Sequence, residues 1–385
     1  MPIVRPDDIP LFTGPRADNT ANPFLTTGDA LIRSLNRARL MAVPGVGETD
    51  GVLGHTAFEL LSAAAVANLI RDAAGALGLD PADPQLLRAF NRCFDDPRRQ
   101  PAAAAVAGVV GRRLGALLLV LWRGDPANRA ARPEWDDAHW AYWRGVRRVV
   151  IGGGLFAGQL GAAAVPVAAA FLRGAGCPIT VERSPWGEAL PLVGLARHTP
   201  PDTARMLLFD FGQTSVKRGL AIYRAGALVD ISRRPSLPAP DRGTLDEPPA
   251  AIARRWAAMR DIVLADWPDR PNAGHSESIA IGLVLAAYMR DGHPLDADRS
   301  SYSRLGRLAP HLATFLRDDL AAAVGRFHAL ALLHDGLAAA CAHAGQPATV
   351  VLTLGTAIGA GYPPEEEGLR AMAAELGWGN SSQLV

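Results

Sequence analysis

Lys217 is the only lysine in this chain of 385 residues, because every other basic residue is an arginine. It follows an apolar run and the motif residues Asp210, Gly212, Thr214 and Ser215. A carboxylate at a strand end can hold Mg²⁺, usually through water. Glycine backbone N–H groups can cradle phosphate oxygens, and a compact ammonium supplies a point charge. The pattern predicts a phosphate-binding turn that Lys217 faces. The alternative is that one lysine survived by chance in an arginine-rich composition.

Three further turns follow apolar runs and could join this one. A glycine loop after a strand suits phosphate, three successive glycines could let a flat ring lie on the backbone, and a carboxylate at a strand end could serve as a base. Each signal is weak alone, and the four together predict a nucleotide site. The residues are Gly355, Thr356, Gly359 and Gly361 in the loop, Gly152, Gly153 and Gly154 in the glycine run, and His334 with Asp335 at the strand end.

Together these segments resemble the motifs of the actin-like ATPase and sugar-kinase superfamily, and within it the ROK family of repressors and sugar kinases. The segment at Asp210 is similar to the first phosphate motif, Asp-x-Gly-x-Thr, and its Thr-Ser-x-Lys continuation is similar to the glycerol-kinase branch. Residues 354–361 resemble the second phosphate motif, and residues 149–155 resemble the adenosine motif. Residues 333–340 are similar to the segment that carries the family's catalytic base, which would be Asp335.

The order of these motifs differs from that of the family. The family runs phosphate 1, base, phosphate 2 and adenosine, whereas this chain runs adenosine, phosphate 1, base and phosphate 2. A circular permutation accounts for the difference, since permutation is tolerated where the old termini lie close together. The resemblance, over about residues 54–361, implies an α/β, two-lobed actin-like (ribonuclease H-like) fold. Residues 1–200 would form the adenosine and sugar lobe, 201–348 the lobe of phosphate 1 and the base, and 349–385 would return to the first lobe.

The implied activity is phosphoryl transfer from ATP and Mg²⁺ to a hydroxyl of a sugar-like substrate. Asp335 would deprotonate that hydroxyl, Asp210 would hold Mg²⁺ through water, and Lys217 with the glycine loops would offset the developing charge. Glu59 and His334 carry over as sugar contacts. For Glu59 an ordinary first-turn helix acid is an equal alternative, for Asp335 the alternative is a helix cap, and for His334 it is a packed loop histidine.

Several residues depart from the family pattern. Gln213 stands where the first motif has its second glycine and could obstruct a phosphate, and Ala357 replaces a glycine of the second motif. His334 replaces an asparagine, and the family's cysteine-rich zinc signature is absent, so we expect no structural zinc. Two rival functions therefore stay open. One is a nucleotide- or sugar-binding regulator with weakened catalysis, and the other is an actin-like ATPase without a small-molecule acceptor.

Composition bounds the remaining possibilities. The net charge is +1 with acids and bases interspersed, which disfavours a nucleic-acid or polybasic membrane surface. Three scattered cysteines and the lack of a secretory signal favour a cytoplasmic protein. We expect a small sugar-like substrate as partner, with a homodimer left open.

Three segments need a structural interpretation of their own. Residues 149–172 are uncharged and long enough to span a membrane, but their glycines favour a strand, a turn and a buried helix. The tryptophans Trp135, Trp140 and Trp143 of the polar insertion 124–147 are expected to form a local core rather than a binding platform. The last twenty or so residues are expected to form a short helix and a frayed tail.

Overall fold

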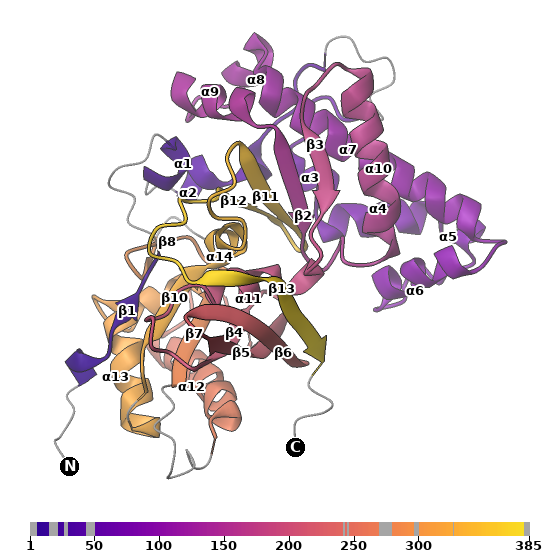
Figure 1. The fold of residues 1–385 in the computed structure, drawn as a ribbon. Helices are drawn as coiled ribbons and strands as arrows, with labels where there is room; N and C mark the ends of the chain where they lie inside the picture. Colours follow the sequence, from indigo (N-terminus) through magenta and orange to yellow (C-terminus); the bar gives the residue numbers. More distant parts are fainter. Residues whose placement is uncertain are drawn as a thin grey trace.

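The computed structural model describes residues 6–14, 22–26, 30–43, 51–241, 243–244, 246–268, 279–295, 300–325 and 327–380. Within them the chain folds into a mixed α/β structure with two main β-sheets, one above the other in Figure 1. We call the part around the larger sheet the sheet lobe and the part around the smaller sheet the helical lobe. Two strands near the ends of the described chain, Leu11–Phe12 and Ala371–Asn380, both belong to the larger sheet (Figure 1).

The sheet lobe is built on seven strands in the order β1-β10-β7-β4-β5-β6-β13. Strands β1, β10, β7 and β4 are parallel, β5 and β6 are antiparallel to their predecessors, and β13 is parallel to β6. The strands are β1 (Leu11–Phe12), β4 (Arg205–Phe211), β5 (Ser215–Arg224), β6 (Ala227–Pro238), β7 (Ile279–Leu285), β10 (Leu330–His334) and β13 (Ala371–Asn380).

Helices cover both faces of this sheet because its central strands are apolar on both sides; every residue of β7 is buried. One face packs on α12 (Pro249–Asp266) and α13 (Leu312–Val324), and the other packs on α11 (Leu190–Leu195) and α14 (Asp335–Cys341). The short elements of this lobe are η1 (Pro6–Asp8), β8 (Met289–Arg290), β9 (His293–Pro294) and η5 (Ser303–Arg307).

The helical lobe has a four-stranded sheet in the order β12-β11-β2-β3, in which β11, β2 and β3 are parallel. These strands are β2 (Arg148–Gly152), β3 (Thr180–Arg183), β11 (Thr349–Leu354) and β12 (Ile358–Gly361). The helices are α1 (Pro23–Thr26), α2 (Ala30–Arg33), η2 (Leu35–Arg37), α3 (Ala57–Leu61), α4 (Ala63–Asp72), α5 (Ala74–Leu77), α6 (Leu86–Arg92), η3 (Cys93–Asp95), α7 (Gln100–Arg123), α8 (Pro126–Ala130), α9 (Asp137–Gly145), α10 (Gln159–Gly174) and η4 (Gly187–Ala189).

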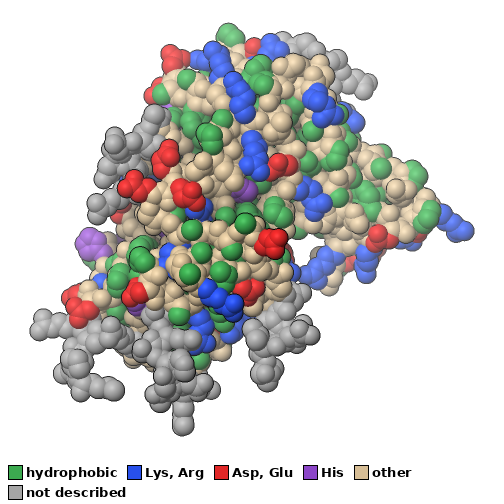
Figure 2. Space-filling view, in the orientation of Figure 1, with side chains coloured by type: hydrophobic (Ala, Val, Ile, Leu, Met, Phe, Trp, Pro, Cys, Tyr) green, Lys and Arg blue, Asp and Glu red, His purple; other side chains and the backbone are tan. Residues whose placement is uncertain are grey.

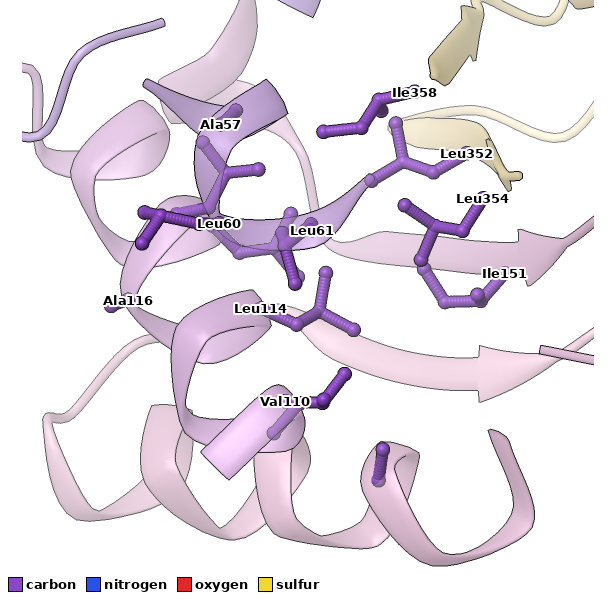
Figure 3. Packing of buried hydrophobic residues seen from close by; sticks show 14 of the residues in the cluster. Ala57, Leu60, Leu61, Val110, Leu114, Ala116, Ile151, Leu352, Leu354 and Ile358 are labelled. Carbon is purple, nitrogen blue, oxygen red and sulfur yellow. The ribbon is translucent and has the colours of Figure 1, made fainter. Parts of the chain in front are cut away.

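A single hydrophobic core fills the helical lobe. Figure 3 shows side chains of α3 and α7 meeting those of β2, β11 and β12, among them Leu61, Leu114, Ile151 and Leu352. Helix α7 is long and apolar enough to cross a membrane, but 72% of its apolar window is buried inside the molecule. It packs closely on α10, because a Cβ on Gly111 would lie 2.4 Å from the carbonyl oxygen of Ala164.

Residues 149–172 form the end of β2, a turn and most of α10, as predicted. The tryptophans Trp135, Trp140 and Trp143 are buried in the core of the helical lobe, so they are core residues, although not a separate local core. The predicted C-terminal helix is wrong, because Ala371–Asn380 is the edge strand β13.

The strand pairing agrees with the permuted motif order. Strand β11 pairs with β2 across Val350 and Val149, and it does not extend the sheet of β4. The predicted boundaries of the lobes need correction at both ends of the chain. Strand β1 pairs with β10 and strand β13 pairs with β6, so residues from 1–200 and from 349–385 complete the sheet lobe. Helix α11 also packs on that lobe, because its residues are apolar on all sides and need cover from two layers.

The ends of α11 and α14 are joined by a buried arginine. Arg197 is 1% exposed and donates hydrogen bonds to the carbonyl oxygens of Arg370 and Cys341, both at 2.8 Å, and to the Glu366 carboxylate at 2.5 Å. Its neighbour His198 is also buried, with Nε2 3.2 Å from Sγ of Cys341. The segment that leads from β12 to β13 is thereby held against the helices between the lobes.

Candidate functional site

Asp210 and Lys217 face each other across the β4–β5 hairpin. They are paired residues in the antiparallel register, and Nζ of Lys217 lies 2.9 Å from Oδ2 of Asp210. The Asp210 side chain is 3% exposed and that of Lys217 is 19% exposed. The predicted motif thus forms a buried ion pair at the end of a central strand, with its ammonium on the more open side.

The turn between these strands is tied down at three points. The Gly212 N–H donates to the carbonyl oxygen of Ser215 at 3.1 Å, and the Tyr302 hydroxyl donates to the carbonyl oxygen of Gly212 at 3.0 Å. The Gln213 side-chain amide donates to the carbonyl oxygen of Ala286 at 3.3 Å, just beyond the end of β7. The Gln213 side chain, which was expected to obstruct a phosphate, is therefore held against the residue that follows β7.

Asp335 lies at the carboxyl end of β10 and begins α14. Its Oδ1 accepts a hydrogen bond from the Gly336 N–H at 2.7 Å and lies 2.7 Å from Nε2 of His334. The Asp335 side chain keeps 30% of its surface exposed. The His334 ring stacks on Tyr288, with centroids 4.5 Å apart. His334 is thus a packed residue that also touches the predicted base.

The Asp335 carboxylate and the Asp210–Lys217 pair act on one another electrostatically. Burial raises the pKa of Asp335, but His334, the Gly336 N–H and Lys217 outweigh it and hold that pKa below its usual range. Burial raises the pKa of Asp210 against the pull of Lys217, and Asp335 and Glu188 raise it further. Burial lowers the pKa of Lys217, but the three carboxylates outweigh it and keep the ammonium charged.

Glu188 is a member of this group that the sequence did not identify. It lies in η4, before α11, and its Oε2 is 3.7 Å from the position that a Cβ on Gly154 would take. No motif marks it, because an acid before a helix is ordinary in sequence. The tertiary structure places Glu188 in the same pocket as Lys217, where its charge raises the pKa of the ammonium.

A pocket lies beside Lys217, between the η4–α11 segment and strands β5 and β6. Its lining is Glu188, Ala189 and Leu192 on one side and Lys217, Arg218, Arg233, Arg234, Pro235 and Ser236 of β5 and β6 on the other. Arg218 and Arg234 also form ion pairs with Asp266 of α12, at 2.7 and 2.6 Å. The β5–β6 register shifts beside Lys217, between Val216 and Arg218, and irregularities of this kind are enriched next to active sites.

Basic side chains thus dominate one side of this pocket, although the surface as a whole is mixed. Figure 2 shows Lys and Arg side chains interspersed with Asp and Glu over the visible face. A pocket of this charge suits an anionic group.

The loop predicted as the second phosphate motif lies beside α14. A Cβ on Gly361 would lie 2.0 Å from the carbonyl oxygen of Gly336, and one on Gly359 would lie 2.2 Å from Oγ1 of Thr353. These two glycines are therefore needed for packing. Gly355 has open space around its Cα, and Thr356 is exposed. The part of the loop that could meet a ligand is its beginning, at Gly355 and Thr356.

The three successive glycines that begin at the last residue of β2 are also mostly packed. A Cβ on Gly153, which has φ of 91°, would lie 2.4 Å from the carbonyl oxygen of Leu354, and one on Gly152 would lie 2.8 Å from Leu190. Only Gly154 faces open space, next to Glu188. Gly152 and Gly153 are therefore needed for packing, and the contact of a flat ring with this turn stays a prediction.

Glu59 has the geometry of the alternative assigned to it. Its Oε2 accepts hydrogen bonds from the N–H and the hydroxyl of Thr56, at 2.7 and 2.9 Å, and Thr56 in turn caps the Glu59 N–H. This capping box begins α3 and leaves the Glu59 side chain 50% exposed. The Glu59 carboxylate is therefore committed to the start of α3.

The described part of the chain has no group of three or more histidine, cysteine or acidic side chains close enough to hold a metal ion directly. The three cysteines are free thiols, and all are buried. No protein-family model matches this chain, and no curated protein matches it.

Proposed function

We propose that this chain is an ATP-dependent phosphotransferase that acts on a hydroxyl of a sugar-like substrate, with a two-lobed actin-like fold in circularly permuted order. The observation that carries the proposal is the meeting of a buried Asp210–Lys217 pair with the Asp335 carboxylate at the ends of β4 and β10, the two strands that flank β7. Carboxyl ends of parallel strands are where α/β sheets bind ligands.

Lys217 and the basic pocket would hold the phosphates of the donor. The Lys217 ammonium borders this pocket and stays charged because of its carboxylate neighbours. An ammonium can follow charge that develops on the transferred phosphoryl group. Gly355 and Thr356, at the open beginning of the second loop, would contact the same group from the helical lobe.

Asp335 would orient and deprotonate the acceptor. Its Oδ1 is occupied by His334 and the Gly336 N–H, so Oδ2 would accept the hydroxyl proton while the hydroxyl oxygen attacks the terminal phosphorus and the bond to ADP breaks. The pKa of Asp335 lies below its usual range, so the carboxylate is in its basic form at neutral pH.

The charge of the site fits a hydrated Mg²⁺ ion. Asp210, Glu188 and Asp335 supply three carboxylates against the one ammonium of Lys217. Because one oxygen of Asp210 is paired with Lys217, that residue would hold the ion through water. When bound, the ion would neutralise charge on the phosphates.

A second candidate is a nucleotide- or sugar-binding regulator with weakened catalysis. It is favoured by the contact of His334 with Asp335, since a lowered pKa makes a carboxylate a weaker base. An actin-like ATPase without an acceptor is the third alternative.

One set of measurements separates the three. Thermal-shift assays with MgATP, MgADP and a panel of sugars would identify ligands, and ADP release would then be followed with and without each stabilising sugar. A kinase releases ADP only with an acceptor, an ATPase releases it without one, and a regulator binds with no turnover. If neither nucleotide nor sugar raises the melting temperature, the proposal is wrong.

A further inference from the structure

Tyr302 is a buried tyrosine whose hydroxyl reaches the predicted phosphate-binding turn. Its residue is 2% exposed, and Oη donates to the carbonyl oxygen of Gly212 at 3.0 Å. The ring packs against Phe211, with centroids 6.3 Å apart and planes at 60°. Tyr302 belongs to the core between the large sheet and helices α12 and α13, so it approaches the turn from that side.

The segment that carries Tyr302 is held by a buried ionic cluster. Arg255 of α12 forms a bidentate pair with Glu247 at 2.5 Å and donates to the carbonyl oxygen of Ser301 at 3.1 Å. Arg304 adds a third contact to Glu247, also at 3.1 Å. The side chains of Arg255 and Glu247 are each 3% exposed. Tyr302 is therefore presented to the turn from a support with little freedom to move.

The contact fixes more than one atom of the turn. A peptide group is planar, and its C=O and N–H point in opposite directions. By holding the carbonyl of Gly212, Tyr302 also aims the N–H of Gln213 away from the core of α12 and α13. Every second side chain of a strand lies on the same face. On β5, Ala221 and Tyr223 are four and six residues beyond Lys217, and both pack in the core on the face opposite α12 and α13. Lys217 therefore lies on that face too. The Gln213 N–H is thus directed to the side of the sheet on which Lys217 lies.

We infer that Tyr302 is a positioning residue for phosphate binding, which holds the Phe211–Ser215 turn in its binding geometry without touching the ligand. This inference rests on the proposed function. The sequence contains no signal for it, since Tyr302 lies 90 positions from Gly212 in the chain.

The test is Tyr302→Phe, with Tyr223→Phe as the matched control. Tyr223 is also buried, at 6% exposed, and its hydroxyl donates to a backbone carbonyl, that of Ala196, away from the turn. Both variants lose one buried tyrosine–carbonyl hydrogen bond, so their melting temperatures should fall by similar amounts. Isothermal titration with MgATP and MgADP, and hydrogen exchange over residues 210–216, are measured for both variants and the unmodified protein.

We expect Tyr302→Phe to weaken MgATP binding about three- to tenfold, the equivalent of one hydrogen bond. Exchange in the turn should become faster, whereas Tyr223→Phe should leave both properties within twofold of the unmodified protein. Equal nucleotide affinities and equal exchange in the two variants would overturn the inference. If the unmodified protein binds no nucleotide but Tyr302→Phe still accelerates exchange in the turn, the proposed function is wrong, while the hydrogen bond from Tyr302 is confirmed to hold the turn.

Discussion

His198 should make the folded protein sensitive to acid. It is 3% exposed, lies against the Cys341 thiol and follows the buried Arg197. Burial, with a smaller contribution from Arg197, lowers the pKa of His198 from 6.5 to about 3. The unfolded chain therefore binds a proton at mild acidity while the folded protein does not. Because the pKa of His198 is depressed in the folded protein, its titration does not reduce the free energy of unfolding above pH 6.5. That free energy decreases as the pH falls from 6.5 toward 3.

The size of the effect follows from these two pKa values. At pH 4.5 nearly every unfolded molecule carries the proton on His198 and almost no folded molecule does. The difference of two pH units from 6.5 corresponds to about 3 kcal/mol of unfolding free energy. His198→Gln removes the titrating group and keeps a polar side chain of similar reach.

The assay is urea unfolding at pH 7.5 and pH 4.5. The unmodified protein should lose about 3 kcal/mol more between the two values than His198→Gln does, since other titrating groups contribute equally to both. His311→Gln is the control, because His311 is exposed at the start of α13, and it should lose as much as the unmodified protein. If His198→Gln and the unmodified protein lose the same amount, His198 is not held neutral by burial.

Three further variants test the site and the junction between the lobes. Lys217→Arg keeps the charge and changes only its shape, so phosphoryl transfer in a steady-state assay should fall more than the melting temperature does, and equal activity would make the lone lysine a compositional accident. Asp335→Asn should lower kcat roughly 10²–10⁴-fold with MgATP affinity little changed. Its control is Asp202→Asn, because Asp202 is a surface carboxylate 2.8 Å from a histidine nitrogen. A loss of stability without loss of turnover would identify Asp335 as a helix cap. Arg197→Met leaves two buried carbonyls without their donor and should lower the free energy of urea unfolding by about 2–5 kcal/mol. The control Arg148→Met removes a partly exposed ion pair and should lower it by about 1 kcal/mol or less. Similar losses in the two variants would contradict the role of Arg197 at the junction.

Short-range patterns in the sequence were reliable where they concern one strand and the turn after it. The apolar run before Asp210 forms β4, and residues 149–172 form a strand, a turn and a helix as their glycines indicated. Alternation, turn residues and a strand-end carboxylate are local properties, so the chain itself carries them. The order of the motifs also predicted that the strand at Thr349–Leu354 returns to the first lobe, and β11 pairs there with β2.

Other predictions failed because several structures satisfy the same local pattern. The segment Ala371–Asn380 has alanines and a leucine that suit a helix, but an open sheet edge at β6 recruited it as a strand. Glu59 matched a substrate motif and a capping box equally well, and Thr56 three residues before it is what completes the box.

The sequence by itself determined the strand-end chemistry: a carboxylate, a glycine turn and one ammonium within eight residues, at the end of an apolar strand. Only the tertiary structure decided which other groups share that site. Glu188 and Tyr302 come from other segments of the chain. Glu188 shares a pocket with Lys217, and Tyr302 reaches Gly212 because a buried ionic cluster holds the start of η5. Long-range contacts depend on how apolar faces pack together, and the spacing of residues along one chain does not encode that packing.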